Sequence, residues 1–136
     1  MTPSYHLDAN VVLRFLRDDD PRQSPAAARL FASAQAGKAR LRLSAVTVAE
    51  IFSVLARVYR HKPAGAAAIL LPLAHSSALA IDDRDCITDA LGRVAQTGVD
   101  FGDAYLAAIA AKQGDSVASF DQDLLAFKDI KTFAPS

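Results

Sequence analysis

The sequence predicts an α/β domain with a mostly parallel sheet, because short apolar segments alternate with longer helical patterns. Residues 5–7, 41–43, 78–81 and 116–120 are typical of strands, and most of the chain between them repeats its apolar residues at the spacing of a helix face. Such alternation favours parallel pairing with helices on both sides of the sheet. We therefore expect a three-layer α/β/α arrangement around a central sheet of four or five strands, in a single domain over residues 1–136.

The composition supports a buried core and argues against strongly charged classes of protein. The chain has 136 residues, 51% of them hydrophobic, and 15 basic residues balance 15 acidic ones. A neutral chain is not expected to coat nucleic acid or a membrane surface, although a small local site could still cut nucleic acid. The single cysteine, the polar start and the lack of an 18-residue apolar run favour a cytoplasmic protein without a membrane span.

In the first half of the chain, the predicted helices are bounded by turn and capping residues. The strand at 5–7 ends on Asp8, and the aspartate-rich turn at 18–21 closes the helix that follows. Ser24 is expected to cap the next helix and Gly37 to end it. The expected helices, in order, are 11–16, 25–36, 45–59 and 63–74.

The second half of the chain contains the segment around which we expect the site to form. A helix is predicted from 84 to 96, and the next one begins at the N-cap Asp100 and stops at Gly114. The apolar run 116–120 then ends directly on Asp121. A short helix at 122–128 and a last strand at 131–133 complete the chain.

Four carboxylates occupy positions where a sheet edge would bring them together. Asp8 and Asp121 each follow a predicted strand, Asp103 lies in the first turn of a helix, and Glu50 lies within one. The carboxyl ends of parallel strands form the edge at which ligands bind. If the four acids converge, their repulsion requires a cation, and oxygen ligands without a histidine or cysteine cluster favour Mg²⁺ or Mn²⁺.

Purely structural roles would also account for the presence of several of these carboxylates. Asp121 is a plausible N-cap, and Asp103 suits the positive end of a helix dipole. Glu50 shares a polar stripe with Ser53 and Arg57, which a solvated helix face also explains.

The same holds for the polar neighbours of these acids. Turn or capping duty accounts for Asn10 and Ser119, and Asp123 is expected to turn away from Asp121 along the helix. The three histidines have no metal-ligand spacing and are interpreted as structural or surface residues: His6, His61 and His75.

In this order and spacing, the motifs resemble the PIN domain, in particular the VapC toxins of bacterial toxin–antitoxin pairs. The resemblance covers essentially the whole chain and rests on the segments LDANVVLRFLRDDDP, VAEIFSVL, DFGDAYLAAIA and SFDQDL. It implies that Asp8, Glu50, Asp103 and Asp121 form the acidic quartet of the family, with Asn10 and Ser119 at its supporting polar positions. It also implies Mg²⁺ or Mn²⁺ dependence, endonucleolytic cleavage of RNA, a homodimer, and inhibition by an antitoxin whose tail enters the active-site groove.

The sequence therefore favours a metal-dependent endoribonuclease that acts as a toxin. Basic side chains are expected to hold the phosphates beside the scissile one, and they are Arg14, Arg17, Arg57, Arg60 and Lys62. A phosphotransfer domain is a weaker alternative, because it needs an acidic pair at the first strand, whereas Asp8 is followed by Ala9 and Asn10. A PIN-domain nuclease of RNA processing and a non-catalytic binding module are further alternatives.

Overall fold

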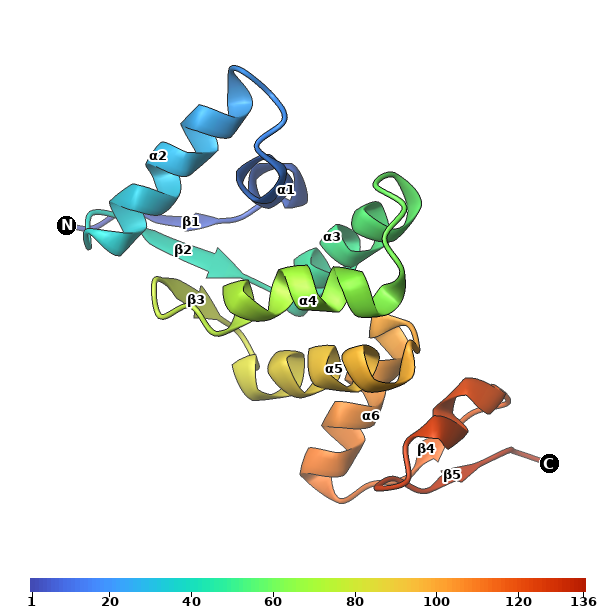
Figure 1. The fold of residues 1–136 in the computed structure, drawn as a ribbon. Coiled ribbons are helices and arrows are strands. Elements are labelled where there is room, and N and C mark those ends of the chain that lie inside the picture. Colours follow the sequence, from blue (N-terminus) through green and yellow to red (C-terminus); the bar gives the residue numbers. More distant parts are fainter.

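The computed structural model describes all residues 1–136, and its helices and strands alternate along the chain (Figure 1). Six α-helices and five strands are present, with one short 3₁₀ helix near the C-terminus. The helices are α1 (Ala9–Arg17), α2 (Gln23–Gln35), α3 (Ala45–Arg57), α4 (Pro63–Ala74), α5 (Arg84–Thr97), α6 (Phe101–Gln113) and η1 (Gln122–Ala126). The strands are β1 (Ser4–His6), β2 (Arg40–Leu43), β3 (Leu79–Ile81), β4 (Val117–Ala118) and β5 (Thr132–Phe133).

All strand pairings are parallel, which confirms the predicted α/β class. β2 lies between β1 and β3, with Leu41 opposite Tyr5 on one side and Leu79 on the other. β4 pairs with β5 in a separate two-stranded sheet, where Val117 is opposite Thr132. The six helices and the parallel strands are consistent with the three-layer α/β/α arrangement.

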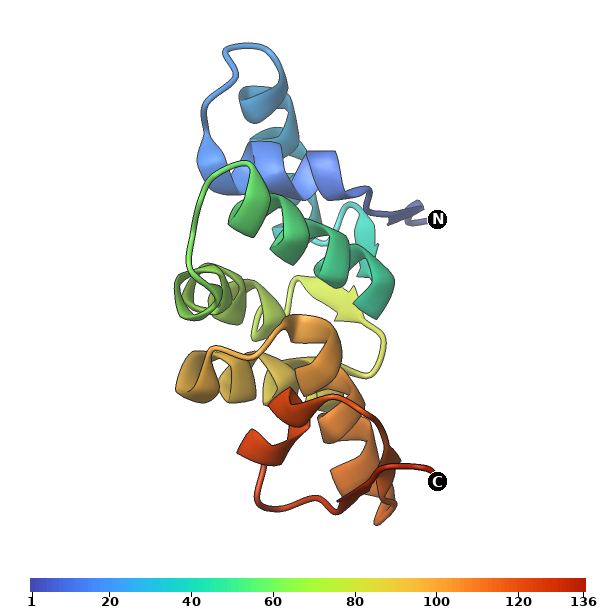
Figure 2. The same cartoon turned by 90° about the vertical axis from the view of Figure 1, so that its right-hand side faces the viewer.

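The sheet is divided, whereas the sequence predicted one sheet of four or five strands. The predicted strand 116–120 is reduced to β4, because Val117 is its one buried residue and Phe120 is exposed. β1 is also polar, and its three residues are all exposed. Two such short strands bury little apolar surface between them, and the helices that follow β3 carry the chain away to the end opposite β1 (Figures 1 and 2).

Local capping chemistry fixes the helix ends largely as predicted. The Asp100 carboxylate accepts a hydrogen bond from the Gly102 N–H at 3.1 Å, and Gly114 ends α6 with φ of 74°. The predicted cap at Ser24 is wrong, because α2 begins at Gln23, two residues before the predicted start at residue 25, and Ser24 is buried within the helix. Arg22 is the cap residue and makes no side-chain capping bond, whereas the carboxylate of Asp20, just before it, accepts from the Arg22 and Gln23 N–H groups.

The core is built around α5, which packs between α4 and α6 (Figure 1). Ile87, Ala90, Leu91 and Val94 are fully enclosed along α5. Alanines face it from both neighbours and permit close helix approach: Ala66 and Ala67 on α4, and Ala104, Ala107 and Ala108 on α6. No helix of the structure has the length and apolar character that a membrane crossing requires.

The guanidinium group of Arg84 closes the C-terminal end of α4. It donates to the carbonyl oxygens of Ala74 at 2.7 Å and Ser76 at 2.9 Å, and also to that of Leu79. The last carbonyls of a helix have no partner within the helix, so a planar cation with several donors satisfies them well. Arg84 therefore joins α4, the following turn and β3 at the first turn of α5.

We expect Arg84→Met to lower the free energy of unfolding by about 2 kcal/mol, because three charge-assisted hydrogen bonds are lost together. Urea unfolding followed by circular dichroism measures the change. The matched control is Arg29→Met, since Arg29 is exposed and makes no ion pair, and its effect should stay within about 0.5 kcal/mol. Equal stability of the two variants would contradict the capping role of Arg84.

Candidate metal centre and charged surface

Three aspartates converge where α6 begins and η1 begins. Asp103, Asp121 and Asp123 each offer one carboxylate oxygen, and these three atoms lie within 4.8 Å of one another. Asp103 is half-buried, and the other two are exposed. The group brings together two of the predicted acids, Asp103 and Asp121, from segments that are separated along the chain.

Asp103 is positioned by the start of α6. The Asp100 cap fixes the first turn of the helix, and Asp103 follows within that turn. Phe101 anchors the turn, because its ring is buried 6.1 Å from the Phe52 ring of α3 and 5.8 Å from the Tyr105 ring. The direction of the Asp103 carboxylate therefore depends on a packed aromatic cluster.

Asp121 and Asp123 are positioned by a hydrogen-bonded turn at the end of β4. The Asp121 N–H donates to the Ser119 hydroxyl oxygen at 2.9 Å. The Asp121 carboxylate accepts in turn from the Asp123 N–H at 2.9 Å, as the N-cap of η1. The capping interpretation of Asp121 and its membership of an acidic group therefore hold together, because one carboxylate oxygen caps the helix while the residue also lies beside Asp103.

The electrostatics of this group fit a hard divalent cation. Burial raises the pKa of the Asp103 carboxyl, and the negative charges of Asp121, Asp100 and Asp123 raise it further. The donor set consists of carboxylate oxygens without histidine or cysteine, which is the chemistry that Mg²⁺ and Mn²⁺ prefer. A cation held there would relieve both the repulsion and the cost of burying the Asp103 charge.

Asp8 and Glu50 lie outside this group. Neither belongs to the set of converging oxygens, and neither is among the charges that raise the pKa of Asp103. Asp8 is the N-cap of α1, where its carboxylate faces the Asn10 N–H at 3.4 Å. Its neighbour Leu7 is buried as expected, but Asp8 itself is exposed. Glu50 is exposed on α3 and makes no ion pair.

Asp123 lies beside Asp121 and Asp103, whereas the sequence analysis expected it to turn away along the helix. A regular α-helix starting at residue 122 would have turned its side chain away from Asp121. The segment is a short 3₁₀ helix instead, and the Asp123 N–H bonds back to the Asp121 carboxylate. The usable signal was the spacing of two residues between the aspartates, which is that of a side-chain-capped turn.

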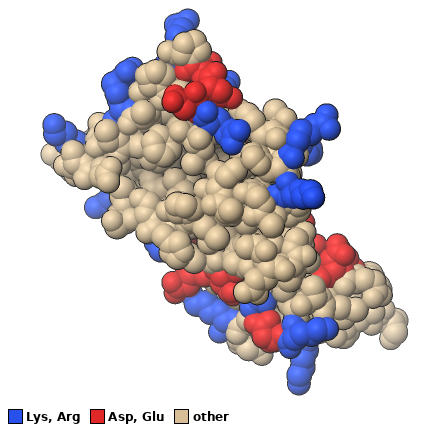
Figure 3. All heavy atoms as spheres, in the orientation of Figure 1, with Lys and Arg blue, Asp and Glu red and all other residues tan.

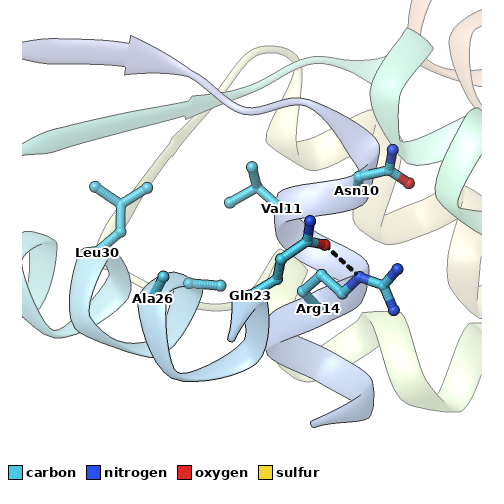
Figure 4. Close-up of a pocket in the computed structure, with 7 residues that line it drawn as sticks. Asn10, Val11, Arg14, Gln23, Ala26 and Leu30 are labelled. Atoms are coloured by element: carbon cyan, nitrogen blue, oxygen red, sulfur yellow. Dashed lines mark hydrogen bonds between the residues drawn. The ribbon is translucent and has the colours of Figure 1, made fainter. Parts of the chain in front are cut away.

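Asn10 lies apart from the acidic group, at a cavity between α1 and α2 (Figure 4). The cavity has a volume of about 390 Å³ and is lined largely by apolar side chains such as Val11 and Leu30. Arg14 borders it and donates to the Gln23 side-chain oxygen at 2.8 Å, as the dashed line in Figure 4 shows.

The five predicted basic residues come from two neighbouring regions, the end of α1 and the α3–α4 connection. Arg14 pairs with Asp19 at 3.3 Å, whereas Arg57, Arg60 and Lys62 are exposed and make no ion pair. Figure 3 shows basic side chains at the margin where the α3–α4 connection lies, beside a broad uncharged surface over α4. The free cations of the predicted set are therefore those of the α3–α4 connection.

Arg17 joins the two regions from a half-buried position. Its guanidinium lies 4.8 Å from the centre of the Tyr59 ring, and the Tyr59 hydroxyl donates to Asp19 at 2.9 Å. Arg17 Nη1 is 3.3 Å from His61 Nε2. Because a guanidinium can only donate, His61 Nε2 is the acceptor in this contact.

The structure thus combines a parallel α/β fold with a group of three aspartates at the starts of α6 and η1. The sequence model of the PIN domain matches residues 5–131. The chain therefore belongs to the PIN domain family, whose fold is that of nucleases. A search among curated proteins finds no match.

We expect Asp103→Asn to raise the melting temperature of the metal-free protein at pH 7. The raised pKa means that ionised Asp103 destabilises the native state, so its stabilising contribution is present below the unfolded pKa and is lost as the pH rises through the folded pKa. The gain in the variant should disappear towards pH 3, where the carboxyl is protonated in both states. Melting curves at several pH values measure it.

The control for this experiment is Asp115→Asn, which removes an exposed carboxylate outside the group. That variant should show no comparable pH-dependent gain. If Asp103→Asn melts no higher than Asp115→Asn at pH 7, the repulsion around Asp103 is not significant.

Proposed function

We propose that this chain is a Mg²⁺- or Mn²⁺-dependent endoribonuclease that acts as the toxin of a toxin–antitoxin pair. The observation that carries the proposal is the convergence of Asp103, Asp121 and Asp123 in a chain that belongs to the PIN domain family. Nothing else in the structure gathers oxygen ligands in this way.

In the proposed site, the three aspartates hold the cation and orient it. Asp103 provides the most buried charge, while Asp121 and Asp123 provide exposed oxygens that a phosphate of RNA can approach. A divalent cation bound there supplies Lewis acidity towards a water molecule and towards the phosphate oxygens in an in-line displacement. Ser119 acts as a positioning residue, because its hydroxyl oxygen holds the Asp121 N–H and with it the turn.

The acidic quartet of this proposal consists of Asp8, Glu50, Asp103 and Asp121, of which Asp8 and Glu50 lie outside the group of three aspartates in the structure. Asn10 supports Asp8 in this proposal. Both acids are exposed, and neither is neutralised by an ion pair, so both are free to join a site. The proposed RNA contacts are the exposed cations Arg57, Arg60 and Lys62, with Arg14 and Arg17 behind them. Phosphate contacts of this kind position an RNA without reading its sequence.

The toxin role is supported by the sequence motifs that resemble VapC toxins. A toxin of this kind acts on cytoplasmic RNA and is held inactive by a cognate antitoxin. The alternative within the same family is a nuclease of RNA processing, which has the same metal chemistry but does not arrest growth. Cleavage and growth experiments separate these two possibilities. A binding module without catalysis would show neither RNA cleavage nor growth arrest.

We expect the wild-type protein to cleave RNA with Mn²⁺ or Mg²⁺, and Asp103→Asn and Asp121→Asn to lose activity by orders of magnitude. Each change keeps the side-chain size and removes one ligand charge, so binding of the cation weakens while the fold persists. Cleavage of end-labelled structured RNAs, with and without EDTA, measures the rates. Asp115→Asn is the control of equal charge change, and full activity in Asp103→Asn would remove that residue from the site.

Expression of this chain alone should arrest the growth of a bacterial host, and the Asp8→Ala form should not. The physical reason is that uncontrolled cleavage of cellular RNA stops protein synthesis, whereas a site lacking one acid is impaired. Growth curves at matched protein levels provide the measurement. If cells that express the wild-type form grow as well as cells that express the Asp8→Ala form, RNA processing or binding is favoured over the toxin role.

A further inference from the structure

The segment that follows β4 carries two of the three converging aspartates, and its position depends on how its far end is anchored. Asp121 and Asp123 lie at the start of η1, and Leu124 beside them is buried. A 3₁₀ helix rises about 2 Å per residue, so Phe127 lies only about 8 Å beyond Asp123 along the chain. The Phe127 N–H donates to the Leu124 carbonyl at 3.2 Å, and the Phe127 side chain is buried. Whatever fixes residues 127–129 therefore also restrains the two acids.

Arg93 of α5 provides this anchor. Its two terminal nitrogens donate to the two carboxylate oxygens of Asp129, one of them at 2.7 Å, and its guanidinium lies 5.3 Å from the centre of the Phe127 ring. The hydrogen bond between Arg93 and Asp129 is the main reason why the pKa of the Asp129 carboxyl is lowered and that of Arg93 is raised. The Arg93 side chain is only 11% exposed. A two-point pair beside an aromatic ring is held in a more definite geometry than an ordinary surface ion pair.

This ion pair is the one that joins the C-terminal segment to the rest of the chain. The ion pair between Arg14 and Asp19 lies in the first half of the chain. Arg93 also pairs with Asp89 at 3.2 Å, but that contact stays within α5. Asp89 and Asp129 thus share one arginine and differ in what they connect.

The acidic group acts on the same segment in the opposite direction. The carboxylate oxygens of Asp103, Asp121 and Asp123 lie within 4.8 Å of one another, and like charges at this separation repel. Asp103 belongs to α6, which is packed along α5, whereas Asp121 and Asp123 are exposed on a short helix that rests on α6. Without a cation, the repulsion therefore tends to lift η1 from α6, and an attachment of residues 127–129 to α5 opposes that movement.

We propose that Arg93 and Asp129 form a clasp that holds η1 in place while the acidic group has no cation, and so preserves the arrangement of carboxylates that binds one. Both are positioning residues, because they act through η1 and are not among the converging carboxylates. A bound cation removes the repulsion, so the clasp matters most before the cation arrives. The effect on cation binding rests on the proposed function, whereas the hold on η1 does not.

Hydrogen exchange of the metal-free protein tests the clasp without reference to activity. Asp129→Asn weakens the attachment of the segment, and the matched control Asp89→Asn removes the same charge from the same arginine within α5. In EDTA at pH 7, residues 119–129 of Asp129→Asn should exchange about fivefold faster than in the wild type, because local opening becomes easier. The amides of α5, and all amides of Asp89→Asn, should keep wild-type rates. Wild-type rates in Asp129→Asn, equal acceleration in both variants, or acceleration along the whole chain would overturn the proposal.

A double variant tests whether the clasp opposes the repulsion. Adding Asp103→Asn to Asp129→Asn removes one of the converging charges while the ion pair stays broken. Exchange of residues 119–129 should then return towards the wild-type rate, because the two changes act on the same equilibrium and are not additive. Exchange as fast as in Asp129→Asn alone would overturn the proposed balance between clasp and repulsion.

Binding of Mn²⁺, followed by electron paramagnetic resonance of the free ion, tests the consequence for the site. The apparent dissociation constant rises as the fraction of molecules with η1 in place falls, so Asp129→Asn should bind Mn²⁺ about fivefold more weakly and Asp89→Asn as well as the wild type. Saturating Mn²⁺ should also restore slow exchange to residues 119–129 of Asp129→Asn, since closure and binding are linked.

The outcomes of this binding experiment separate the clasp from the proposed function. Unchanged affinity in Asp129→Asn, or exchange that stays fast at saturating Mn²⁺, would overturn the role of the clasp in cation binding. Wild-type protein that binds no Mn²⁺ would instead refute the proposed metal site, and the exchange rates in EDTA alone would then decide the hold on η1.

Discussion

The packing of α5 between α4 and α6 is the constraint on which the rest of the structure depends. Its buried side chains meet alanines on both neighbours, so the three helices approach closely and behave as one block. This block sets the distance between the β1–β2–β3 sheet and the β4–β5 sheet. It also holds the start of α6, where the Phe101 ring packs beneath the turn that carries Asp103.

The acidic group balances two opposing requirements. Asp103 must be buried enough to be fixed in direction, and that burial, with three neighbouring carboxylates, raises the pKa of its carboxyl. Asp121 and Asp123 must stay accessible, and hydrogen bonds to backbone N–H groups order their turn without covering them. In the proposed metal site, Asp103 is therefore the rigid inner ligand, and Asp121 and Asp123 are exposed outer ligands that leave room for a substrate.

Sequence reasoning succeeded where the determining interactions are local. The Asp100 cap, the Gly114 stop and the helix pattern between them depend on residues a few positions apart, and the structure has all three. It also brought Asp103 and Asp121 to one place, because both lie in consecutive elements. The division of the sheet and the position of Asp8 were beyond its reach, since they depend on which strand edges meet. The direction of Asp123 was not predicted, because the residues after Asp121 form a short 3₁₀ helix in which the Asp123 N–H bonds back to the Asp121 carboxylate.

The neighbour-to-neighbour packing of the helices has a consequence for how the protein is made. α1 contacts α2, α3 contacts α4, α4 contacts α5, and α5 contacts α6, so most helix contacts join segments that are adjacent in sequence. Contacts between consecutive helices lose less loop-closure entropy than contacts between distant segments, so the helical part of the fold can form before the parallel strands pair. The helical block can therefore assemble progressively as the chain leaves the ribosome.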